Sequence, residues 1–513
     1  MKEHDDVVRV GVGEGPASST EDAAAGGWRK EPTAIPLPNA PNPEAALAAI
    51  GALPYPALLR SATAPDSRSG YSYLCAIPSR VLQLGPLGVQ RFVHREGGIH
   101  GEVLSLSPFD ALEGELALHE GLALPSLPPF QGGAVGYLGY EMGSHLEPLW
   151  VPAGSGPGLP QMHMAFYPEV VAWDHAKGTC WYFSRRREEP GPLLDALRGH
   201  EADTLNDLGS WPSLSGKAMG PHPSYPVPGL PGIRSTISRD SYLEKVEQVR
   251  QLILEGEIFQ ANLTQAFHRE WKGDSIALFS HLVEHYPAPF AAYLRLAGTE
   301  PGAAAVVSTS PESFLRVTGR PGPQVVRTRP IKGTAPRALD AATDARNARA
   351  LQSSEKDRSE NVMIVDLLRN DLSRVCEDAS VVVTELCQLE SHPSVHHLVS
   401  TIQGVLHQHA GVVDLLRATF PCGSITGAPK LRAMEILTQM EPTAREVYTG
   451  ALGWLGCDGA AELSVAIRTI TLREGVAWFP AGGGVVLESD PMAEYDETVA
   501  KVRGILNALE ATA

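Results

Sequence analysis

The alternation of apolar and polar residues predicts a strand-rich first half of the chain. Between residues 55 and 185, short apolar runs such as 135–140 and 163–168 alternate with turns that contain Gly and Pro, which is typical of strands. Residues 1–30 are rich in Ala, Gly and Glu without such a pattern, so we expect a disordered tail there. Residues 191–235 include a cluster of Pro, Gly and Ser and are expected to form a connector.

Helical periodicity becomes clear from Ser238 onward. This serine precedes apolar residues at helical spacing and is predicted to be an N-cap. One uninterrupted helix is predicted over 341–370, because that segment is rich in helix formers and lacks both Pro and Gly. Further helices are predicted at 427–440, with Thr426 as the N-cap, and at 491–510.

Strands are expected between these helices, so the pattern predicts an α+β protein. It also indicates an N-terminal region at 45–190 and a second region at 238–510 that carries the candidate chemistry. The predicted strands of this second region are 303–308, 313–317, 324–327 and 463–470.

Composition narrows the classes of function. The 513 residues carry a net charge of −17, which argues against a surface for nucleic acid or for an anionic membrane. No apolar run reaches the roughly 18 residues that a membrane span needs. The N-terminus turns acidic at once, unlike a signal peptide, and none of the six cysteines forms a C-x-x-C pair. We therefore expect a cytoplasmic protein without structural zinc.

Lys332 is the most informative single residue. It lies in the string Thr328-Arg-Pro-Ile-Lys-Gly-Thr334, between a proline that fixes one backbone dihedral and a glycine that lets a ligand approach the backbone. This setting favours a reactive lysine. A solvated surface lysine is the alternative, and the seven residues do not decide between them.

Two pairs of carboxylates lie at helical spacing. Asp357 and Glu360 are three residues apart in one predicted helix, and Glu494 and Glu497 are three apart in another. Hard cations such as Mg²⁺ take one or two carboxylates together with water and substrate oxygens. Two solvated helix faces would give the same spacing, so the spacing alone does not establish a metal site.

Other segments could bind an anion. Gly482–Gly484 follow an apolar strand and could offer backbone N–H groups, although a simple turn is the alternative. The string 423–430 precedes a helix, whose N-terminus attracts anions, and capping alone is again the alternative. Arg468 lies among apolar residues and needs a partner, either a substrate carboxylate or an internal acid. His392, His396 and His397 show no metal-ligand spacing and fit buried structural histidines.

Taken together, these strings resemble the chorismate-utilising enzyme family, most densely over 238–510. The resemblance implies an α+β fold in which two antiparallel sheets face each other and helices pack outside. The strings that carry it are Gly256-Glu-Ile-Phe-Gln-Ala-Asn-Leu-Thr-Gln265, Ser310-Pro-Glu-Ser-Phe314, Arg329-Pro-Ile-Lys-Gly-Thr334, Asp357-Arg-Ser-Glu-Asn-Val-Met-Ile-Val-Asp-Leu-Leu-Arg-Asn-Asp371, His396-His-Leu-Val-Ser400, Ile425-Thr-Gly-Ala-Pro-Lys430 and 482–501.

The resemblance also implies roles for individual residues. Lysine at position 332 is similar to the aminodeoxychorismate synthase component I branch, in which it would attack C2 of chorismate while Glu312 protonates the leaving hydroxyl. His397 matches a residue that assists elimination in the anthranilate branch. Mg²⁺ would be held by Glu360 and Glu497, with Asp357 and Glu494 acting directly or through water. The implied substrate-binding residues are Gly333, Thr334, Thr426, Tyr448, Arg468, Gly482, Gly483, Gly484 and Lys501.

Two partners follow from the same resemblance. Ammonia would come from a separate glutaminase subunit, because no cysteine lies in the Gly-x-Cys-x-Gly setting of a glutaminase nucleophile. A bound tryptophan, structural or inhibitory, is the second. The residues that match its pocket are Ser61, Arg68, Ser69, Gly70, Tyr71, Pro289, Phe290 and Ala291.

Two alternatives to the aminodeoxychorismate branch stay open. One is an anthranilate synthase component I, which would release pyruvate and form anthranilate. The other is a non-catalytic, tryptophan-binding regulatory relative, which loss of the acidic positions would favour. All four acidic positions and Lys332 are present.

Overall fold

The structure is a computed structural model, in which most of the chain is described. The described residues are 11–12, 27–61, 70–95, 98–147, 156–187, 191–199, 211, 214, 222–296, 303–393 and 395–513. Most of the expected tail and the middle of the expected connector therefore lie outside the described residues.

Within this part of the chain, the strands form two sheets of 13 strands each, which we call sheet A and sheet B. Every strand pair is antiparallel except β1 with β7. Sheet A contains β1 (Gly11–Val12), β5 (Arg80–Gly85), β6 (Gly88–Arg95), β7 (Gly98–Leu104), β8 (Gly133–Leu138), β9 (Met162–Tyr167), β17 (Ser313–Val317), β18 (Val325–Arg329), β19 (Ile331–Pro336), β20 (Val382–Ser391), β21 (Val395–Val405), β23 (Ala451–Gly456) and β24 (Ala461–Val465). Sheet B contains β2 (Thr33–Pro36), β3 (Ala57–Arg60), β4 (Tyr71–Cys75), β10 (Glu169–Asp174), β11 (Thr179–Ser184), β12 (Tyr225–Pro226), β13 (Arg234–Ser235), β14 (Gln260–Glu270), β15 (Phe290–Arg295), β16 (Ala305–Ser310), β22 (Gly427–Ala428), β25 (Thr469–Arg473) and β26 (Val476–Val485).

Both halves of the sequence contribute to both sheets. In sheet A, β8 pairs with β23, so that Val135 lies opposite Trp454. In sheet B, β3 pairs with β15, so that Leu59 lies opposite Ala292. The strand-rich first half therefore forms part of the same two sheets as the region after residue 238.

Alternation along each strand divides the core into layers. In β8, Val135 and Tyr137 pack in a cluster with Ala292 and Ala172 of sheet B, so this face lies between the sheets. Ala134 and Leu138, which point the other way, pack in a cluster with residues of the helices outside sheet A. The same period of two makes Tyr293 face the helices outside sheet B. The prediction of two facing antiparallel sheets with helices outside is confirmed.

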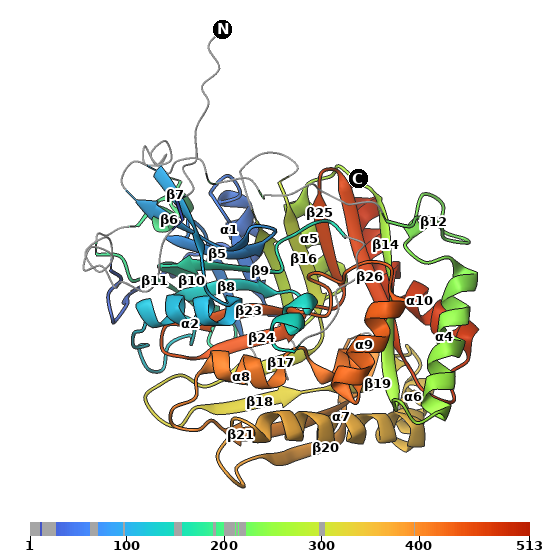
Figure 1. Ribbon diagram of the computed structural model, residues 1–513. Helices are drawn as coiled ribbons and strands as arrows, with labels where there is room; N and C mark the ends of the chain where they lie inside the picture. The colour runs from blue at the N-terminus through green and yellow to red at the C-terminus, as the bar shows by residue number, and fades with distance from the viewer. Residues whose placement is uncertain are drawn as a thin grey trace.

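The helices cover the two outer faces (Figure 1). Helices α2, α7 and α8 pack on sheet A, and α1, α3, α5 and α10 pack on sheet B. Helices α4, α9 and α10 cover the region around β14. No helix in the described segments has both the length and the apolarity that crossing a bilayer needs. The helices are α1 (Pro43–Ala49), α2 (Pro108–Leu118), η1 (Tyr140–His145), α3 (Pro192–Leu197), α4 (Arg239–Leu254), α5 (Ser275–His285), α6 (Ala341–Ser353), α7 (Glu355–Ser373), α8 (Val412–Thr419), η3 (Gly423–Ile425), α9 (Lys430–Met440) and α10 (Pro491–Ala511).

Some predicted elements are correct and others are wrong. Ser238 caps α4 as predicted, since its side chain accepts a hydrogen bond from the Ser241 N–H. The single helix predicted over 341–370 is wrong. Ser354 has an extended backbone and its side chain caps Asp357, so the chain forms α6 and α7 with a break between them.

Two further predictions about local structure are also wrong. The strand predicted over 463–470 ends at Val465, and Arg468 has φ +50° between β24 and β25. Thr426 does not cap the helix that was predicted over 427–440. Its hydroxyl donates to the Cys422 carbonyl, and α9 begins only at Lys430, after Pro429.

Candidate active site

A bulge in β19 sets the direction of Lys332. The register between β19 and β21 shifts between Ile331 and Thr334, and Gly333 has φ +88°. A side chain on Gly333 would collide with Asp357, since an added Cβ would lie 2.9 Å from the Asp357 Cβ. The glycine is therefore required both by its backbone conformation and by the close approach of α7.

The Lys332 amine lies among acidic groups and against the glycine strand. Its Nζ is 3.6 Å from the position that a Cβ on Gly484 would occupy. Burial lowers the pKa of this half-buried lysine, and the charges of Glu360 and Glu312 oppose that shift. A lysine whose neutral form is favoured in this way is a candidate nucleophile.

Glu312 lies between β16 and β17 and is buried. Its Oε1 atom has no hydrogen-bond partner among the described residues. Burial raises the pKa of the Glu312 carboxyl, and Ser424 and the charge of Lys332 partly offset the rise. The protonated form is therefore favoured, as a general acid requires.

The two pairs of carboxylates approach each other from α7 and α10. The Ser489 hydroxyl donates to Glu494 Oε1 at 2.6 Å, which fixes that side chain. Glu494 Oε2 and Glu497 Oε1 lie 2.8 and 3.9 Å from the point that a Cβ on Gly483 would occupy. Burial raises the pKa of Glu360, Lys332 and Lys356 partly offset the rise, and the negative charges of Asp357 and Glu494 add to it. An effect of Glu494 of α10 on Glu360 of α7 is consistent with one shared region between the two helices.

These carboxylates could hold a divalent cation only if water and substrate oxygens supplied the remaining ligands. Among the residues that the structure describes, no three His, Cys, Asp or Glu side chains form a group that could hold a metal ion. Mg²⁺ often takes only one or two carboxylates and completes its octahedron with water and substrate oxygens. The carboxylates of α7 and α10 fit such a partial set of ligands, because a cation would stabilise the ionised form of Glu360, which burial and then the charges of Asp357 and Glu494 disfavour.

The three glycines lie inside a strand rather than at a turn. In β26, Gly482, Gly483 and Gly484 pair with Thr264, Leu263 and Asn262 of β14. Lys501 of α10 donates to the Gly482 carbonyl at 2.8 Å and also forms an ion pair with Glu497 at 2.6 Å. The glycine strand therefore lies directly beside the acidic face of α10.

Tyr448 extends this glycine surface. It is buried, and burial raises its pKa to about 12, with Gly482 and Thr264 beside it. The phenol is therefore a neutral hydrogen-bonding group. Thr426, also fully buried, is connected to the same place because its carbonyl accepts a hydrogen bond from the Asn262 N–H at 3.0 Å.

Arg468 is an exposed arginine with a free guanidinium. Among the described residues it has no side-chain hydrogen bond or ion pair, and desolvation by the surrounding protein lowers its pKa. Its charge acts on His397, which is buried and whose pKa is lowered to about 3, chiefly by burial. His397 is therefore neutral, and its Nδ1 lies 3.0 Å from the Thr334 hydroxyl. An arginine without a protein partner is suited to a carboxylate ligand.

The other two histidines are structural in their contacts. His396 is buried and lies between Ser391 and Asp344, at 2.8 and 3.0 Å. His392 is partly exposed, and its ring lies 5.4 Å from that of His397.

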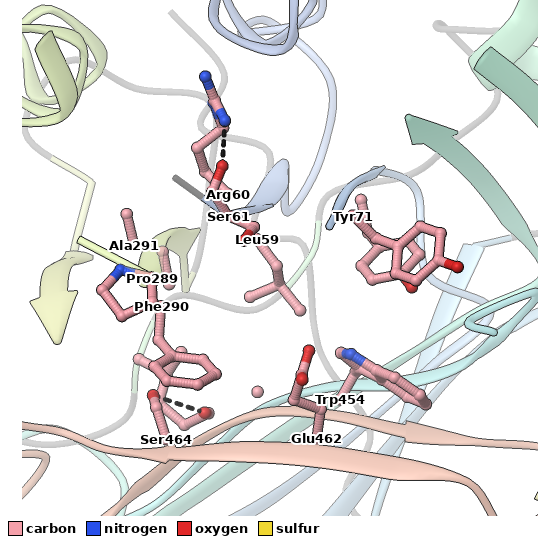
Figure 2. A pocket seen from close by; sticks show the side chains of 14 residues that line it. Leu59, Arg60, Ser61, Tyr71, Pro289, Phe290, Ala291, Trp454, Glu462 and Ser464 are labelled. Carbon is pink, nitrogen blue, oxygen red and sulfur yellow. Dashed lines mark hydrogen bonds between the residues drawn. The ribbon is translucent and has the colours of Figure 1, made fainter. Parts of the chain in front are cut away.

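A separate pocket opens between the two sheets (Figure 2). It encloses about 350 Å³, including the part open to solvent, and its walls come from β3, β4, β15, β23 and β24. The Glu462 carboxylate projects between the Phe290 ring and the Trp454 indole (Figure 2). The lining residues are Leu59, Arg60, Ser61, Tyr71, Tyr73, Pro289, Phe290, Ala291, Ala292, Leu452, Gly453, Trp454, Glu462 and Ser464.

The structure brings five of the eight residues predicted for a tryptophan pocket to this place. Gly70 is not among the lining residues, and Arg68 and Ser69 lie outside the described residues. Trp454 and Glu462 were not predicted from the sequence. β23 is buried throughout and β24 is buried except at Glu462, and nothing in their local sequence distinguishes them from ordinary sandwich residues.

Gln260 and Ser424 were also missed at the Lys332 site. Gln260 Nε2 would lie 2.1 Å from a Cβ on Gly484, so it fills the space beside that glycine. Ser424 acts on Glu312 through hydrogen bonding. Gln260 lies within a string that carries the family resemblance and Ser424 immediately precedes another, so their nearness to those strings was the available signal.

Comparisons with known proteins agree with this geometry. A family model described as chorismate binding enzyme matches residues 92–507. Aminodeoxychorismate synthase component 1 of Klebsiella aerogenes is 37% identical over 93% of this chain and 99% of the relative. Anthranilate synthase component 1 of Streptomyces coelicolor is 38% identical over 78% of this chain and 77% of the relative.

A solved structure gives the same result for the fold. Anthranilate synthase component I from Streptococcus pneumoniae superposes with a TM-score of 0.67 at 29% identity, covering 87% of this chain and 93% of that one. The matched residues include strands of both sheets and every candidate residue around Lys332. The chain therefore belongs to the chorismate-binding enzyme family.

Proposed function

We propose that this chain is the aminating subunit of an aminodeoxychorismate synthase, which converts chorismate and ammonia to 4-amino-4-deoxychorismate. The observation that carries the proposal is Lys332, whose pKa is lowered by burial and whose amine lies beside the glycine strand, near Glu312. Relatives named for the aminodeoxychorismate and anthranilate reactions match at similar identity, so the choice between them rests on this lysine.

In the first step, the neutral Lys332 amine attacks C2 of chorismate. A C2–N bond forms, the two ring double bonds shift, and the C4–O bond breaks. Glu312 gives its proton to the departing oxygen, which leaves as water. Burial prepares both groups for these roles, since it lowers the pKa of Lys332 and raises that of Glu312.

In the second step, ammonia attacks C4. The double bonds shift back, the C2–N bond breaks, and Lys332 leaves as a neutral amine. The ammonium group that forms at C4 then returns a proton to Glu312. The enolpyruvyl group stays on the ring throughout, which separates this reaction from anthranilate formation.

The residues around Lys332 have the charges that a dianionic substrate requires. Arg468 and Lys501 would neutralise substrate carboxylates, and Tyr448 and the glycine strand would hydrogen-bond them. We assign Mg²⁺ to Glu360 and Glu497, with Asp357 and Glu494 acting directly or through water. When bound, the ion would fix a substrate carboxylate and offset its charge. His397, neutral and hydrogen-bonded to Thr334, would line the same region.

Ammonia requires a source outside this chain, because its sequence lacks a glutaminase nucleophile motif. We propose a separate glutaminase subunit that releases ammonia to the Lys332 site. All six cysteines are unpaired thiols, which suits a reducing cytoplasm.

The Phe290 pocket suits a bound tryptophan. Aromatic rings would contact the indole, and the Glu462 carboxylate would pair with the ammonium group. Burial raises the pKa of the Glu462 carboxyl, and Arg316, 3.7 Å away, partly offsets the rise. The ammonium group of a bound tryptophan would favour the ionised form further.

Product identity tests the proposal directly. The purified chain is incubated with chorismate, Mg²⁺ and ammonium, and the products are separated by mass spectrometry. Aminodeoxychorismate, which retains the enolpyruvyl group, is the expected product. Anthranilate with free pyruvate would instead identify an anthranilate synthase, and tryptophan binding without any turnover would identify a regulatory relative.

A further inference from the structure

Arg445 is a buried arginine that the proposed chemistry does not use. It follows α9 in the chain, and only 3% of its surface is exposed. Its guanidinium stacks over the Tyr140 ring, 4.5 Å from the ring centre. An isolated buried charge would be strongly unfavourable, so its contacts must compensate for the lost hydration.

All five N–H groups of this guanidinium have acceptors. Nε and one NH2 proton donate to the two oxygens of Glu441, at 2.8 and 2.6 Å. The other NH2 proton donates to the Asn262 carbonyl at 2.6 Å. The NH1 protons donate to the Ile425 carbonyl and the Thr449 hydroxyl, at 3.2 and 3.3 Å. No donor is left for a substrate.

Besides Glu441, the acceptors belong to three separate segments of the candidate active site. Asn262 is the β14 residue paired with Gly484. Ile425 immediately precedes Thr426. Thr449 follows Tyr448, whose own N–H donates to the Arg445 carbonyl. One side chain thus fixes the backbone beside the glycine strand, the loop of Thr426 and the loop of Tyr448.

Glu441 extends the same connection. Its Oε1 also accepts a hydrogen bond from the Thr264 N–H at 3.0 Å, and Thr264 is the β14 residue paired with Gly482. Glu141 holds the loop from the other side, accepting from the N–H groups of Arg445 and Glu446 at 2.7 and 3.0 Å.

We infer that Arg445, paired with Glu441, is a positioning residue that aligns the glycine strand, Thr426 and Tyr448 for binding of the substrate carboxylates. It contrasts with Arg468, whose guanidinium has no partner among the described residues and is left for the substrate. The inference rests on the proposed function only for the assignment of this surface to chorismate. Because misplacement by about 1 Å can cost a hundredfold in rate, loss of this alignment should be measurable.

The test compares Arg445→Lys with Arg185→Lys. Arg185 is equally buried and donates to backbone carbonyls of Gln131, Lys30 and Leu122, none of which is a candidate site residue. Lysine has three donors and cannot replace five. Both variants should lose thermal stability. Only Arg445→Lys should weaken chorismate binding, measured by calorimetry with Mg²⁺ and without ammonia, by about tenfold or more.

A second variant keeps the inference testable if Arg445→Lys does not fold. Glu441→Gln keeps the side-chain shape and should weaken chorismate binding in the same direction, by a smaller factor. Equal binding by wild type, Arg445→Lys and Glu441→Gln would overturn the inference, as would equal weakening in Arg185→Lys. Calorimetry reports binding whichever product forms, so an anthranilate product would refute the proposed function and leave this test intact.

Discussion

The Lys332 amine lies 3.6 Å from the point that a Cβ atom on Gly484 would occupy, so the candidate nucleophile and the glycine strand form one surface. Lys332 belongs to sheet A and Gly484 to sheet B. The site therefore forms where an edge strand of one sheet meets a strand of the other, with α7 and α10 supplying acidic side chains.

Replacing Lys332 tests the covalent step. Lys332→Ala should reduce aminodeoxychorismate formation by about a thousandfold or more, because the variant lacks the amine that would attack C2. Lys332→Arg is the matched control, since it keeps a positive charge but stays protonated and cannot act as a nucleophile. Turnover with ammonium and thermal unfolding are measured together. Wild-type rates in either folded variant would exclude the adduct.

Glu312 should act through its proton. Glu312→Gln should lower kcat by about 10²–10⁴-fold, because an amide cannot protonate the leaving hydroxyl. Burial raises the pKa of Glu312, so wild-type kcat should fall as the pH rises through that raised pKa. The pH profile is recorded at a fixed concentration of free ammonia. The variant should lack this decline, and an unchanged profile would remove Glu312 from the mechanism.

The acidic groups of α7 and α10 should make activity depend on Mg²⁺. Chelation should abolish turnover, and added Mg²⁺ should restore it. Glu497→Gln should raise the Mg²⁺ concentration for half-maximal activity by about tenfold or more, since one ionised oxygen ligand is lost. Glu510→Gln, on the exposed end of the same helix, is the control. Full activity in chelator would contradict the metal assignment.

The Phe290 pocket should bind tryptophan through its acidic wall. Calorimetry with L-tryptophan should show one site, and Glu462→Gln should weaken binding by about tenfold, because the pairing with the ammonium group is lost. Indole-3-propionate, which lacks the ammonium group, should bind wild type and variant equally. Absence of heat and of any thermal shift with tryptophan would contradict the assignment.

The sequence predicted features that depend on local pattern. The cap at Ser238 and the α10 helix after Asp490 follow from residue preferences at helix starts. The break at Ser354 was missed, because its side chain competes with the helix by capping Asp357, while the surrounding residues all favour a helix.

Features that depend on packing could not be predicted from the sequence pattern. Apolar residues continue on both sides of Arg468, so its positive φ left no signal. Trp454 and Glu462 reach Phe290 only because their strands lie in the facing sheet. In the sequence, Arg445 is indistinguishable from an ordinary arginine that follows a helix. Its acceptors come from segments far apart in the chain, so only the folded structure brings them together.

Glu446 should make stability depend on pH. Burial raises its pKa from 4.5 to about 7, although the N–H groups of Gly158 and Leu159 donate to its carboxylate. The folded state therefore binds a proton more tightly than the unfolded chain. This contribution is fully present below pH 4.5 and is lost as the pH rises through about 7. The contribution of Glu446 to the free energy of unfolding is at most on the order of 3 kcal/mol.

The Glu446→Gln variant cannot titrate at this position. Its free energy of unfolding, measured in urea, should therefore decline less over this pH range. Glu141, whose pKa burial raises to about 6, stays in both proteins, so its own burial contributes to both curves, while its charge adds to the rise at Glu446. Parallel stability curves for the two proteins would contradict the assignment.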